Sequence, residues 1–361
     1  MSCLVIAEAG VNHNGILEQA LELVNVAADA GADIVKFQTF KTEALVTKSA
    51  GRASYQERNL DDKDSQFEML KKLELTEKDF IQIHRHCEKK KIKFLSTPFD
   101  TESLNFLVRE GLIDRIKVPS GEITNLPFIL EMAKTQLPII LSTGMATLSE
   151  IEKALAVISY GYLNPEAKPT MDEFWKCYWS SHAKEVLGKK VTVLHCTTEY
   201  PALPETINLK AMDTLKAAFS VPIGYSDHSR GIHIPIAAVA RGASIIEKHF
   251  TLDRSMVGPD HKASLEPTEL KEMVSNIREL EIALGDGRKV PAPIEIENRK
   301  VARKILVASK VIQKGEKFTS DNLKIKRNGE GLLPESYWNF IGQTAEANYN
   351  EGEAIKSGAQ S

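Results

Sequence analysis

A strand-then-helix alternation runs through roughly the first 280 residues, and this repeat restricts the fold more than any other feature of the sequence. Each unit starts with a short apolar run rich in β-branched residues and continues with a longer stretch of helical periodicity. We count eight units. Eight consecutive βα units close a TIM-type barrel, whereas a doubly wound sheet usually ends earlier. The repeat therefore predicts an α/β fold built on a (β/α)8 barrel.

The expected strands are short, and helical periodicity follows each of them. We place the strands at Leu4–Ala7, Ile34–Phe37, Ile92–Leu95, Arg115–Val118, Pro138–Leu141, Val191–Leu194, Val221–Gly224 and Ser244–Lys248. The clearest helical stretches are Leu17–Ala30, Thr76–Lys90, Leu148–Tyr160, Asn208–Ala218 and Pro267–Leu284. Two connections exceed the usual few residues. Residues 39–73 leave the carboxyl end of a strand, where active-site lids arise, and residues 161–190 are expected to form a surface excursion packed by its own aromatic side chains.

A change of composition near Gly285 ends the barrel domain, which we place at residues 1–284. Residues 285–300 contain two Gly and two Pro, and this composition predicts an extended linker. Residues 301–361 carry short apolar runs broken by Lys-Gly and Asn-Gly turns, which indicates a small β-rich domain. A domain of this size is marginally stable alone, so we expect it to dock on another surface.

Charge and composition exclude several classes of protein. The 46 Lys and Arg residues nearly balance the 49 Asp and Glu residues, so no global basic field exists to attract nucleic acid. The four cysteines lie far apart, without a zinc spacing or a disulfide framework, which favours a reducing cytoplasm. No apolar run approaches 18 residues and no basic stretch precedes Glu8, so we expect neither a membrane span nor a secretion signal.

Potentially reactive side chains recur where each expected strand ends. In a barrel these positions converge on the mouth at the carboxyl ends of the strands, where barrel enzymes carry out their chemistry. Polar residues scattered over a protein surface would not recur at the end of each strand. The set comprises Glu8, Lys36, Gln38, Thr97, Lys117, Ser120, Ser142, Thr143, His195, Ser226, Asp227, His228, Glu247, Lys248 and His249.

The histidines allow more than one interpretation. His228 and His249 end neighbouring strands and are candidates for a metal site, although a histidine pair can also be purely structural. We interpret His195 as structural, satisfying the backbone inside a packed layer. His13 lies on a mouth loop, where capping the next helix would be a sufficient role.

Lys36 and Lys117 follow continuous apolar runs, so their ammonium groups are expected in the barrel mouth with little water nearby. A buried lysine needs an anion or loses its proton. One interpretation is a salt bridge to Glu8 or Glu122. The interpretation that we favour is a cradle for phosphate and carboxylate groups. The hydroxyls that would complete this cradle are those of Thr97, Ser120, Ser142 and Ser226.

Eight motifs in a fixed order resemble those of the sialic acid synthases, a family that includes the bacterial legionaminic acid synthases. The resemblance extends nearly from end to end, and KGEKFTSDNLKIKRNGEG (314–331) is similar to that family's antifreeze-like domain. The motifs are IAEAGVNHNG (6–15), ADIVKFQTF (32–40), FLSTPFD (94–100), IKVPSGEITN (116–125), ILSTGMAT (140–147), LHCTTEYP (194–201), GYSDHSRG (224–231) and EKHFTLDRSMVGPDHKASLEP (247–267).

The resemblance implies a TIM barrel followed by an antifreeze-like domain, and a metal-dependent condensation of phosphoenolpyruvate with an N-acetylated mannose-type sugar and water. The products would be phosphate and a nine-carbon 2-keto acid. By the same resemblance, His228 and His249 hold a divalent ion, Mn²⁺ before Mg²⁺ or Co²⁺, which polarises the open-chain aldehyde. Positions that bind phosphoenolpyruvate are matched by Lys36, Thr97, Lys117, Ser120, Ser142 and Ser226.

The resemblance also implies roles for other residues. Glu122 matches the base that acts on the attacking water. Arg327 matches an arginine that reaches the barrel of a neighbouring subunit, which implies a domain-swapped homodimer. Thr198 and Asn328 depart from the family pattern, the first at a phosphate-side contact and the second directly after that arginine. Sugar-contacting positions, of which Glu8 is also a catalytic candidate, are matched by Glu8, Gln38, Tyr200 and Asp260.

Two other functions compete with a synthase. Lys117 could form a Schiff base with pyruvate in a lyase or aldolase, since barrels host that chemistry with a desolvated lysine. Alternatively, the chain could be a non-enzymatic sugar- or ice-binding protein that uses its C-terminal domain, although the polar strand ends argue against this. The sequence does not distinguish N-acetylmannosamine from a diacetamido-trideoxyhexose as the acylated sugar.

Overall fold

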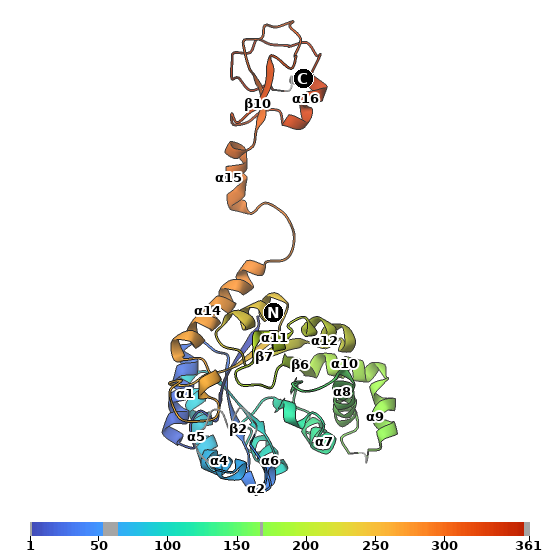
Figure 1. Ribbon diagram of the computed structural model, residues 1–361. Helices are drawn as coiled ribbons and strands as arrows, with labels where there is room; N and C mark the ends of the chain where they lie inside the picture. Colours follow the sequence, from blue (N-terminus) through green and yellow to red (C-terminus); the bar gives the residue numbers. More distant parts are fainter. Residues whose placement is uncertain (1, 53–63, 167–168, 357–361) are drawn as a thin grey trace. The chain divides into compact units, whose positions relative to one another are not determined.

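Parallel strands and helices alternate through the first part of the chain (Figure 1). The computed structural model describes residues 2–52, 64–166 and 169–356, and the chain divides into two units, residues 1–285 and 286–361. Within the described residues the first unit contains eight strands, and each was predicted from the sequence. They are β1 Leu4–Gly10, β2 Ile34–Thr39, β3 Lys93–Pro98, β4 Ile116–Val118, β5 Ile139–Ser142, β6 Val191–Cys196, β7 Ile223–Asp227 and β8 Ile245–His249.

These strands form one parallel sheet in the order β3-β2-β1-β8-β7-β6-β5-β4. Strands β3 and β4 contact one another, so the predicted barrel is nearly closed, although no ladder joins these two strands in the part of the chain that is described. No described helix is long and apolar enough to cross a membrane. The helices of this unit are α1 Leu17–Asp29, α2 Thr42–Leu45, α4 Gln66–Leu73, α5 Glu77–Lys90, α6 Thr101–Arg109, α7 Leu126–Lys134, α8 Leu148–Leu163, α9 Met171–Tyr178, α10 Ser181–Lys190, α11 Pro204–Ile207, α12 Ala211–Phe219, α13 His233–Ala240 and α14 Pro267–Leu284, with the short turns η1 Ser120–Glu122 and η2 His261–Ala263.

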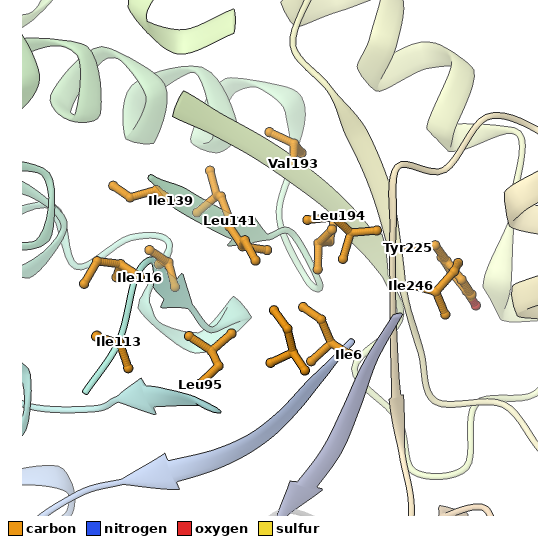
Figure 2. Packing of buried hydrophobic residues seen from close by; sticks show 14 of the residues in the cluster. Ile6, Leu95, Ile113, Ile116, Ile139, Leu141, Val193, Leu194, Tyr225 and Ile246 are labelled. Carbon is orange, nitrogen blue, oxygen red and sulfur yellow. The ribbon is translucent and has the colours of Figure 1, made fainter. Parts of the chain in front are cut away.

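An apolar layer fills the barrel beneath the polar mouth. Ile6 is fully buried and precedes Glu8 by two residues on β1, so both side chains point to the same side of the sheet. An added Cβ at Gly224 would lie 2.5 Å from Leu194 Cδ2 and 2.6 Å from the backbone oxygen of Ile245, so the interior has no spare room there. Burying one such aliphatic side chain stabilises the fold by roughly 1.5–3 kcal/mol. The buried hydrophobic cluster extends over both faces of the sheet, since neighbouring strand residues such as Val193 and Leu194 point to opposite sides. Figure 2 labels members of this cluster: Ile6, Leu95, Ile113, Ile116, Ile139, Leu141, Val193, Leu194, Tyr225 and Ile246.

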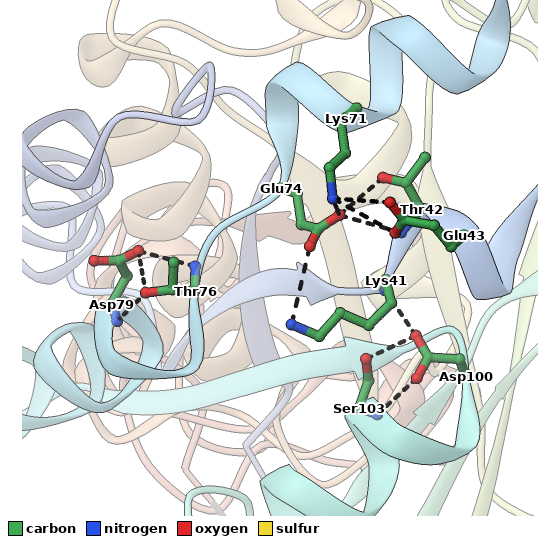
Figure 3. A network of polar contacts seen from close by, with 9 residues as sticks. All are labelled: Lys41, Thr42, Glu43, Lys71, Glu74, Thr76, Asp79, Asp100 and Ser103. Carbon is green, nitrogen blue, oxygen red and sulfur yellow. Dashed lines mark hydrogen bonds and ion pairs between the residues drawn. The ribbon is translucent and has the colours of Figure 1, made fainter.

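The start of the long connection after β2 is tied to Asp100, which follows β3, and the two ends of the connection are tied to each other (Figure 3). Asp100 accepts a hydrogen bond from Lys41 N at 2.8 Å. Glu74 accepts hydrogen bonds from the backbone N and Oγ1 of Thr42, at 3.2 and 3.0 Å, and pairs with Lys71 at 3.1 Å. The middle of the connection, residues 53–63, lies outside the described residues, so its predicted role as a lid stays a prediction.

The excursion at residues 161–190 is mostly helical. It contains the end of α8 and the whole of α9 and α10. Aromatic side chains pack it, as the sequence predicts: the ring centroids of Tyr160 and Phe174 lie 5.1 Å apart, and those of Trp175 and Trp179 lie 6.2 Å apart. The excursion is therefore an extra helical layer on the barrel rather than a loop.

The second unit contains a small two-stranded antiparallel sheet. Strands β9 Ile305–Ala308 and β10 Leu323–Lys326 pair, and the turn η3 Pro334–Ser336 and helix α16 Tyr337–Phe340 follow them. Isolated bridges such as that between Ile312 and Tyr349 add to the β structure. The buried core of this unit comprises Leu306, Ala308, Ile312, Phe318, Leu323, Ala345 and Ile355.

The prediction of an extended linker at residues 285–300 is wrong over its second half, because helix α15 spans Pro293–Ala302. Pro293 occupies the first turn of the helix, where a missing N–H breaks no hydrogen bond. The Glu295 carboxylate accepts a hydrogen bond from Ala292 N at 2.7 Å and so satisfies the helix start. The proline that suggested a linker therefore begins a helix.

Candidate active site

A cavity of about 450 Å³ opens at the carboxyl ends of the barrel strands. All eight strands, or the loops directly after them, contribute to its lining. The structure thus brings together most of the residues that strand phase and resemblance selected. Glu122 and Arg327, selected by resemblance, are not among the described lining residues, and neither are Thr143, His195, Asp227 and Lys248, selected by strand phase. The predicted residues that line the cavity are Glu8, Lys36, Gln38, Thr97, Lys117, Ser120, Ser142, Tyr200, Ser226, His228, Glu247, His249 and Asp260.

Glu8, Lys36, Lys117 and Glu247 form what we call the charged floor of the cavity. Lys36 Nζ lies 2.7 Å from Glu8 Oε2 and 3.7 Å from Glu247 Oε2, and Lys117 Nζ lies 3.3 Å from Glu247 Oε1. None of the four is more than 4% exposed. The lysines are therefore paired with carboxylates, as buried charges require. The partner of Lys117 is Glu247, not Glu122 as one interpretation of the sequence had it.

The two glutamates of the charged floor differ in proton affinity. Burial raises the pKa of Glu8 to about 7, because the loss of water outweighs the attraction of Lys36. Burial acts in the same direction on Glu247, but Lys117 and Lys36 together lower the pKa of Glu247 to about 2. Burial also lowers the pKa of Lys117. Glu8 can therefore exchange a proton near neutral pH, whereas Glu247 stays ionised.

Two hydroxyls beside the charged floor have no hydrogen-bond partner among the described residues. They are Ser142 Oγ and Thr198 Oγ1, both buried in the cavity lining. Gly144 allows this close approach, since an added Cβ would lie 2.1 Å from Thr198 Oγ1. Gly144 N instead donates to Ser120 Oγ at 2.9 Å. An unsatisfied buried polar group costs about 1–3 kcal/mol, so a ligand with acceptor oxygens would relieve a penalty at this wall.

The two histidines face one another across one side of the cavity. The ring centroids of His228 and His249 lie 5.5 Å apart. His228 Nδ1 lies 2.6 Å from the carbonyl oxygen of Thr197, and donation from Nδ1 leaves Nε2 unprotonated. Burial lowers the pKa of His228 to about 4 and that of His249 well below its usual range, so both imidazoles are neutral at pH 7.

Neutral imidazoles are the form that binds divalent metal ions. His249 Nδ1 is buried without a hydrogen-bond partner among the described residues, which leaves a nitrogen lone pair unused. The described residues hold no cluster of three or more His, Cys, Asp or Glu side chains suited to a metal ion. A metal ion held by this pair would have two protein ligands and would complete its coordination with water or substrate oxygens.

Polar groups suited to sugar hydroxyls surround the histidine pair. The Tyr200 ring lies 4.1 Å from the His228 ring, centroid to centroid, and Asp260 Oδ2 lies 3.8 Å from His249 Nδ1. Burial raises the pKa of Asp260 to about 6. Gln38 Nε2 donates to Glu8 Oε1 at 3.3 Å. Donors and acceptors therefore lie beside the charged floor and beside the histidines.

Two residues that the resemblance selected lie outside the described cavity lining. Glu122, the expected base, accepts a hydrogen bond from Asn125 Nδ2 at 2.7 Å and is only half-buried. It lies on the 3₁₀ turn η1, where Ser120 faces Gly144 and the residue two positions later points in a different direction. Arg327 is exposed directly after β10 in the second unit.

The structure also places three further residues that the sequence analysis discussed. Glu247 was placed at a strand end but given no role, and its position two residues before His249 on the same strand was the signal for a shared face. His195 Nε2 lies 2.6 Å from the Ile207 carbonyl oxygen, which agrees with a structural role. His13 Nδ1 accepts from Gly15 N at 3.0 Å, just before α1.

The nearly closed barrel with a polar, charged cavity at its carboxyl end defines a TIM-barrel enzyme. A model of the NeuB family matches residues 23–289, and the chain belongs to this family. This match and the relatives below confirm the resemblance to the sialic acid synthase family, while the antifreeze-like domain stays a prediction.

Named relatives and a solved structure agree with this family. N,N'-diacetyllegionaminic acid synthase of Campylobacter jejuni is 49% identical, with 98% of this chain and 98% of that protein covered. The protein of the same name from Legionella pneumophila is 41% identical, with 98% of this chain and 94% of that protein covered. An N-acetylneuraminic acid (sialic acid) synthetase from Leptospira borgpetersenii, whose crystal structure is known in complex with citrate, is 36% identical in sequence. The TM-score is 0.65, with 83% of this chain and 92% of that chain covered. These relatives confirm the prediction of an enzyme.

Proposed function

We propose that this chain condenses phosphoenolpyruvate with a diacetamido-trideoxyhexose and water, and releases phosphate and a nine-carbon 2-keto acid of the legionaminic type. The observation that carries the proposal is a single cavity in which two almost fully buried lysines lie near a neutral histidine pair. The choice of sugar is supported by relatives named N,N'-diacetyllegionaminic acid synthase. N-acetylmannosamine is the alternative sugar.

The charged floor suits the anionic substrate. Phosphoenolpyruvate carries a phosphate and a carboxylate, and Lys36 and Lys117 offer two ammonium groups without bulk water. Lys36 Nζ lies 2.7 Å from Glu8 Oε2, so the substrate anion would share this ammonium group with the Glu8 carboxylate. Ser142 and Thr198 would donate their unpartnered hydroxyls to substrate oxygens.

The histidine pair suits a divalent metal ion. His228 and His249 would hold Mn²⁺, with Mg²⁺ and Co²⁺ as alternatives, and the ion would supply Lewis-acid polarisation of the sugar aldehyde. Tyr200 and Asp260 beside the pair would orient the sugar hydroxyls.

In the proposed reaction, carbon three of phosphoenolpyruvate attacks the aldehyde carbon, and the aldehyde oxygen takes up a proton to become a hydroxyl. Water adds at carbon two, and phosphate leaves by cleavage of the C–O bond as the water oxygen becomes the 2-keto oxygen. Of the two protons that the water loses, one replaces the proton taken up by the aldehyde oxygen and the other leaves with phosphate. The added water must lose a proton. Glu8 is buried in the cavity with a pKa of about 7, so its carboxylate is suited to accept this proton. Glu122 lies outside the described cavity lining, and we do not assign it this step.

The test measures phosphate release from phosphoenolpyruvate and Mn²⁺ with each of the two sugars. We expect the highest kcat/KM with the diacetamido-trideoxyhexose, loss of turnover after chelation, and loss in His228→Ala and His249→Ala variants that stay folded. Lys41→Met, at a lysine that pairs with Glu74 at 3.9 Å and does not line the cavity, is the control. Higher kcat/KM with N-acetylmannosamine would reverse the choice of sugar.

The same preparation tests the competing functions. Borohydride trapping of a covalent adduct between Lys117 and pyruvate would support a Schiff-base lyase instead. Failure of both sugars to release phosphate would contradict the synthase and favour a binding protein. We expect no adduct, because Lys117 Nζ is already paired with Glu247.

We further propose that the second unit is an antifreeze-like domain that covers the barrel of a partner subunit in a homodimer. The exposed Arg327 and the motif at residues 314–331 support this. Mixing His228→Ala with Arg327→Ala tests it, since a swapped dimer restores one intact site on subunit exchange. No recovery of activity after verified exchange would contradict the swapped arrangement.

A further inference from the structure

Met145 combines an exposed apolar side chain with an unfavourable backbone conformation. It follows β5, lines the cavity, and is 72% exposed. Its φ angle is 65°, in the left-handed region that is costly for residues with a Cβ and is usually occupied by Gly, Asn or Asp. Such residues persist where the surrounding structure enforces them, and they concentrate at ligand-binding sites.

Hydrogen bonds on both sides enforce this conformation. Thr143 donates from its backbone N and from Oγ1 to the Leu194 carbonyl oxygen, at 3.1 and 2.8 Å. Gly144 N donates to Ser120 Oγ at 2.9 Å. Helix α8 then begins at once with a capping box at Thr147. The methionine between these anchors has little freedom to adopt another φ, so its backbone and Cβ are held at the cavity opening.

Met145 is one of several apolar residues that line the cavity from loops, whereas the charged floor lies on the strands. The charged residues lie within the strands, whereas the apolar lining residues lie on the loops that follow the strands. A ligand whose anionic part reaches the charged floor would therefore have its outer part among apolar side chains. The loop-borne apolar lining residues are Val11, Phe99, Pro119, Met145 and Pro259.

We infer that Met145 is a specificity-determining residue that covers the apolar substituents of the sugar, an N-acyl methyl group or the methyl group of a 6-deoxy sugar. This inference rests on the proposed function. Without ligand, most of the side chain is in water, so contact with a methyl group would bury apolar surface. The thioether is flexible and adapts to an irregular partner. The loop thus keeps an apolar residue where a glycine would be easier to accommodate.

Oxidative footprinting tests the contact without requiring turnover. Hydrogen peroxide converts exposed methionines to sulfoxides, and mass spectrometry gives the rate at each residue. We expect the diacetamido-trideoxyhexose, added with phosphoenolpyruvate, to slow oxidation of Met145 by about fivefold or more relative to phosphoenolpyruvate alone. Met171 on α9 is 50% exposed and does not line the cavity, so its rate should not change. Equal rates at Met145 with and without the sugar would overturn the inference.

Two substitutions give a second readout. Met145→Gly relieves the backbone conformation and removes the side chain, so we expect no decrease in Tm but a rise of about tenfold in KM for the sugar. KM for phosphoenolpyruvate should stay within about twofold, and Met145→Leu should keep most of the sugar affinity. An unchanged sugar KM in Met145→Gly, or an equal rise for both substrates, would overturn the inference while wild-type turnover leaves the proposed function intact. No turnover by the wild type rejects both.

Discussion

Two neighbouring residues of β8, Glu247 and Lys248, belong to two buried charged networks of opposite character. Lys248 is fully buried, and its Nζ lies 2.6 Å from Asp227 Oδ2 and also donates to the Ser229 carbonyl oxygen. Asp227 accepts further hydrogen bonds from Tyr225 OH at 3.0 Å and from Ser229 N and Oγ at 3.1 and 3.0 Å. We call Tyr225, Asp227, Ser229 and Lys248 the closed network, because its charges and hydrogen bonds are satisfied by its own members.

The charged floor, to which Glu247 belongs, is incomplete by comparison. Its ion pairs are shared among four residues at up to 3.7 Å, and Ser142 Oγ and Thr198 Oγ1 beside it have no partner among the described residues. Side chains alternate along a strand, so residues 247 and 248 face opposite sides of the sheet. The closed network holds the backbone around His228, between Asp227 and Ser229. The charged floor, in contrast, leaves donors for a ligand.

The largest effect on stability is expected from opening the closed network. Lys248→Met leaves the carboxylate of Asp227 buried without its cation, so we expect the free energy of unfolding to fall by about 3–5 kcal/mol. Urea denaturation measures this. The double variant Asp227→Asn/Lys248→Met removes both charges and should recover part of the loss. A single variant as stable as the wild type would show that the two networks do not differ in this way.

The second effect is a dependence of the free energy of unfolding on pH, caused by His228 in the cavity at the carboxyl end of the barrel. An unfolded His228 binds a proton near pH 6.5, whereas burial lowers the pKa of His228 in the folded protein to about 4. Between these values the unfolded state binds more protons, so stability is lost as the pH falls from about 6.5 to 4, by up to about 3 kcal/mol for this residue in metal-free protein.

The variant His228→Asn isolates this contribution. The raised pKa values of Glu8 and Asp260 act in the opposite direction over part of the same range, so the slope of the wild type alone is not decisive. We expect the variant to lose less stability than the wild type between pH 6.5 and 4 in the presence of a chelator. Parallel pH curves for the two proteins would contradict a neutral, buried His228.

The third effect separates ligand binding from stability. Lys117→Met should raise the dissociation constant for phosphoenolpyruvate by about tenfold or more, because a cation is lost from a site with little water. The free energy of unfolding should change by less than about 1.5 kcal/mol, since Glu247 keeps Lys36 at 3.7 Å as a partner. Calorimetry with Lys41→Met as control measures both. A large loss of stability with unchanged affinity would make the floor a second closed network.

Much of the fold was predictable because its signals are local and periodic. Every strand was found from short apolar runs, and strand phase placed residues as distant in sequence as Glu8 and His249 in one cavity. The helix at 293–302 was missed because Pro293 has the same appearance at the start of a helix as in a linker. A count of Gly and Pro in a segment does not show that one of the prolines lies in the first turn of a helix.

The pairing within the site was harder to predict. Sequence phase gives the side of the sheet on which a side chain lies but not its partner across the barrel. The salt-bridge interpretation therefore considered Glu8 and Glu122 as partners of the lysines and did not consider Glu247, the partner of Lys117. The direction of Glu122 depends on the 3₁₀ turn at Ser120–Glu122, which no periodic pattern announces. Nor did the sequence reveal that Thr198 leaves a hydroxyl without a partner, since this depends on all the surrounding loops.

The smallest effect is also the sharpest test of the comparison. Thr198→Val removes an unpartnered buried hydroxyl while keeping its shape, so we expect the protein without ligand to gain a few tenths to about 1 kcal/mol in free energy of unfolding. The same change should raise KM for phosphoenolpyruvate about threefold, because a donor to the substrate is lost, whereas Thr198→Ser should keep the wild-type KM. Stability and affinity therefore move in opposite directions only if the hydroxyl serves the ligand. A less stable valine variant with an unchanged KM would mean that Thr198 already has a partner inside the protein and that this wall of the cavity is closed.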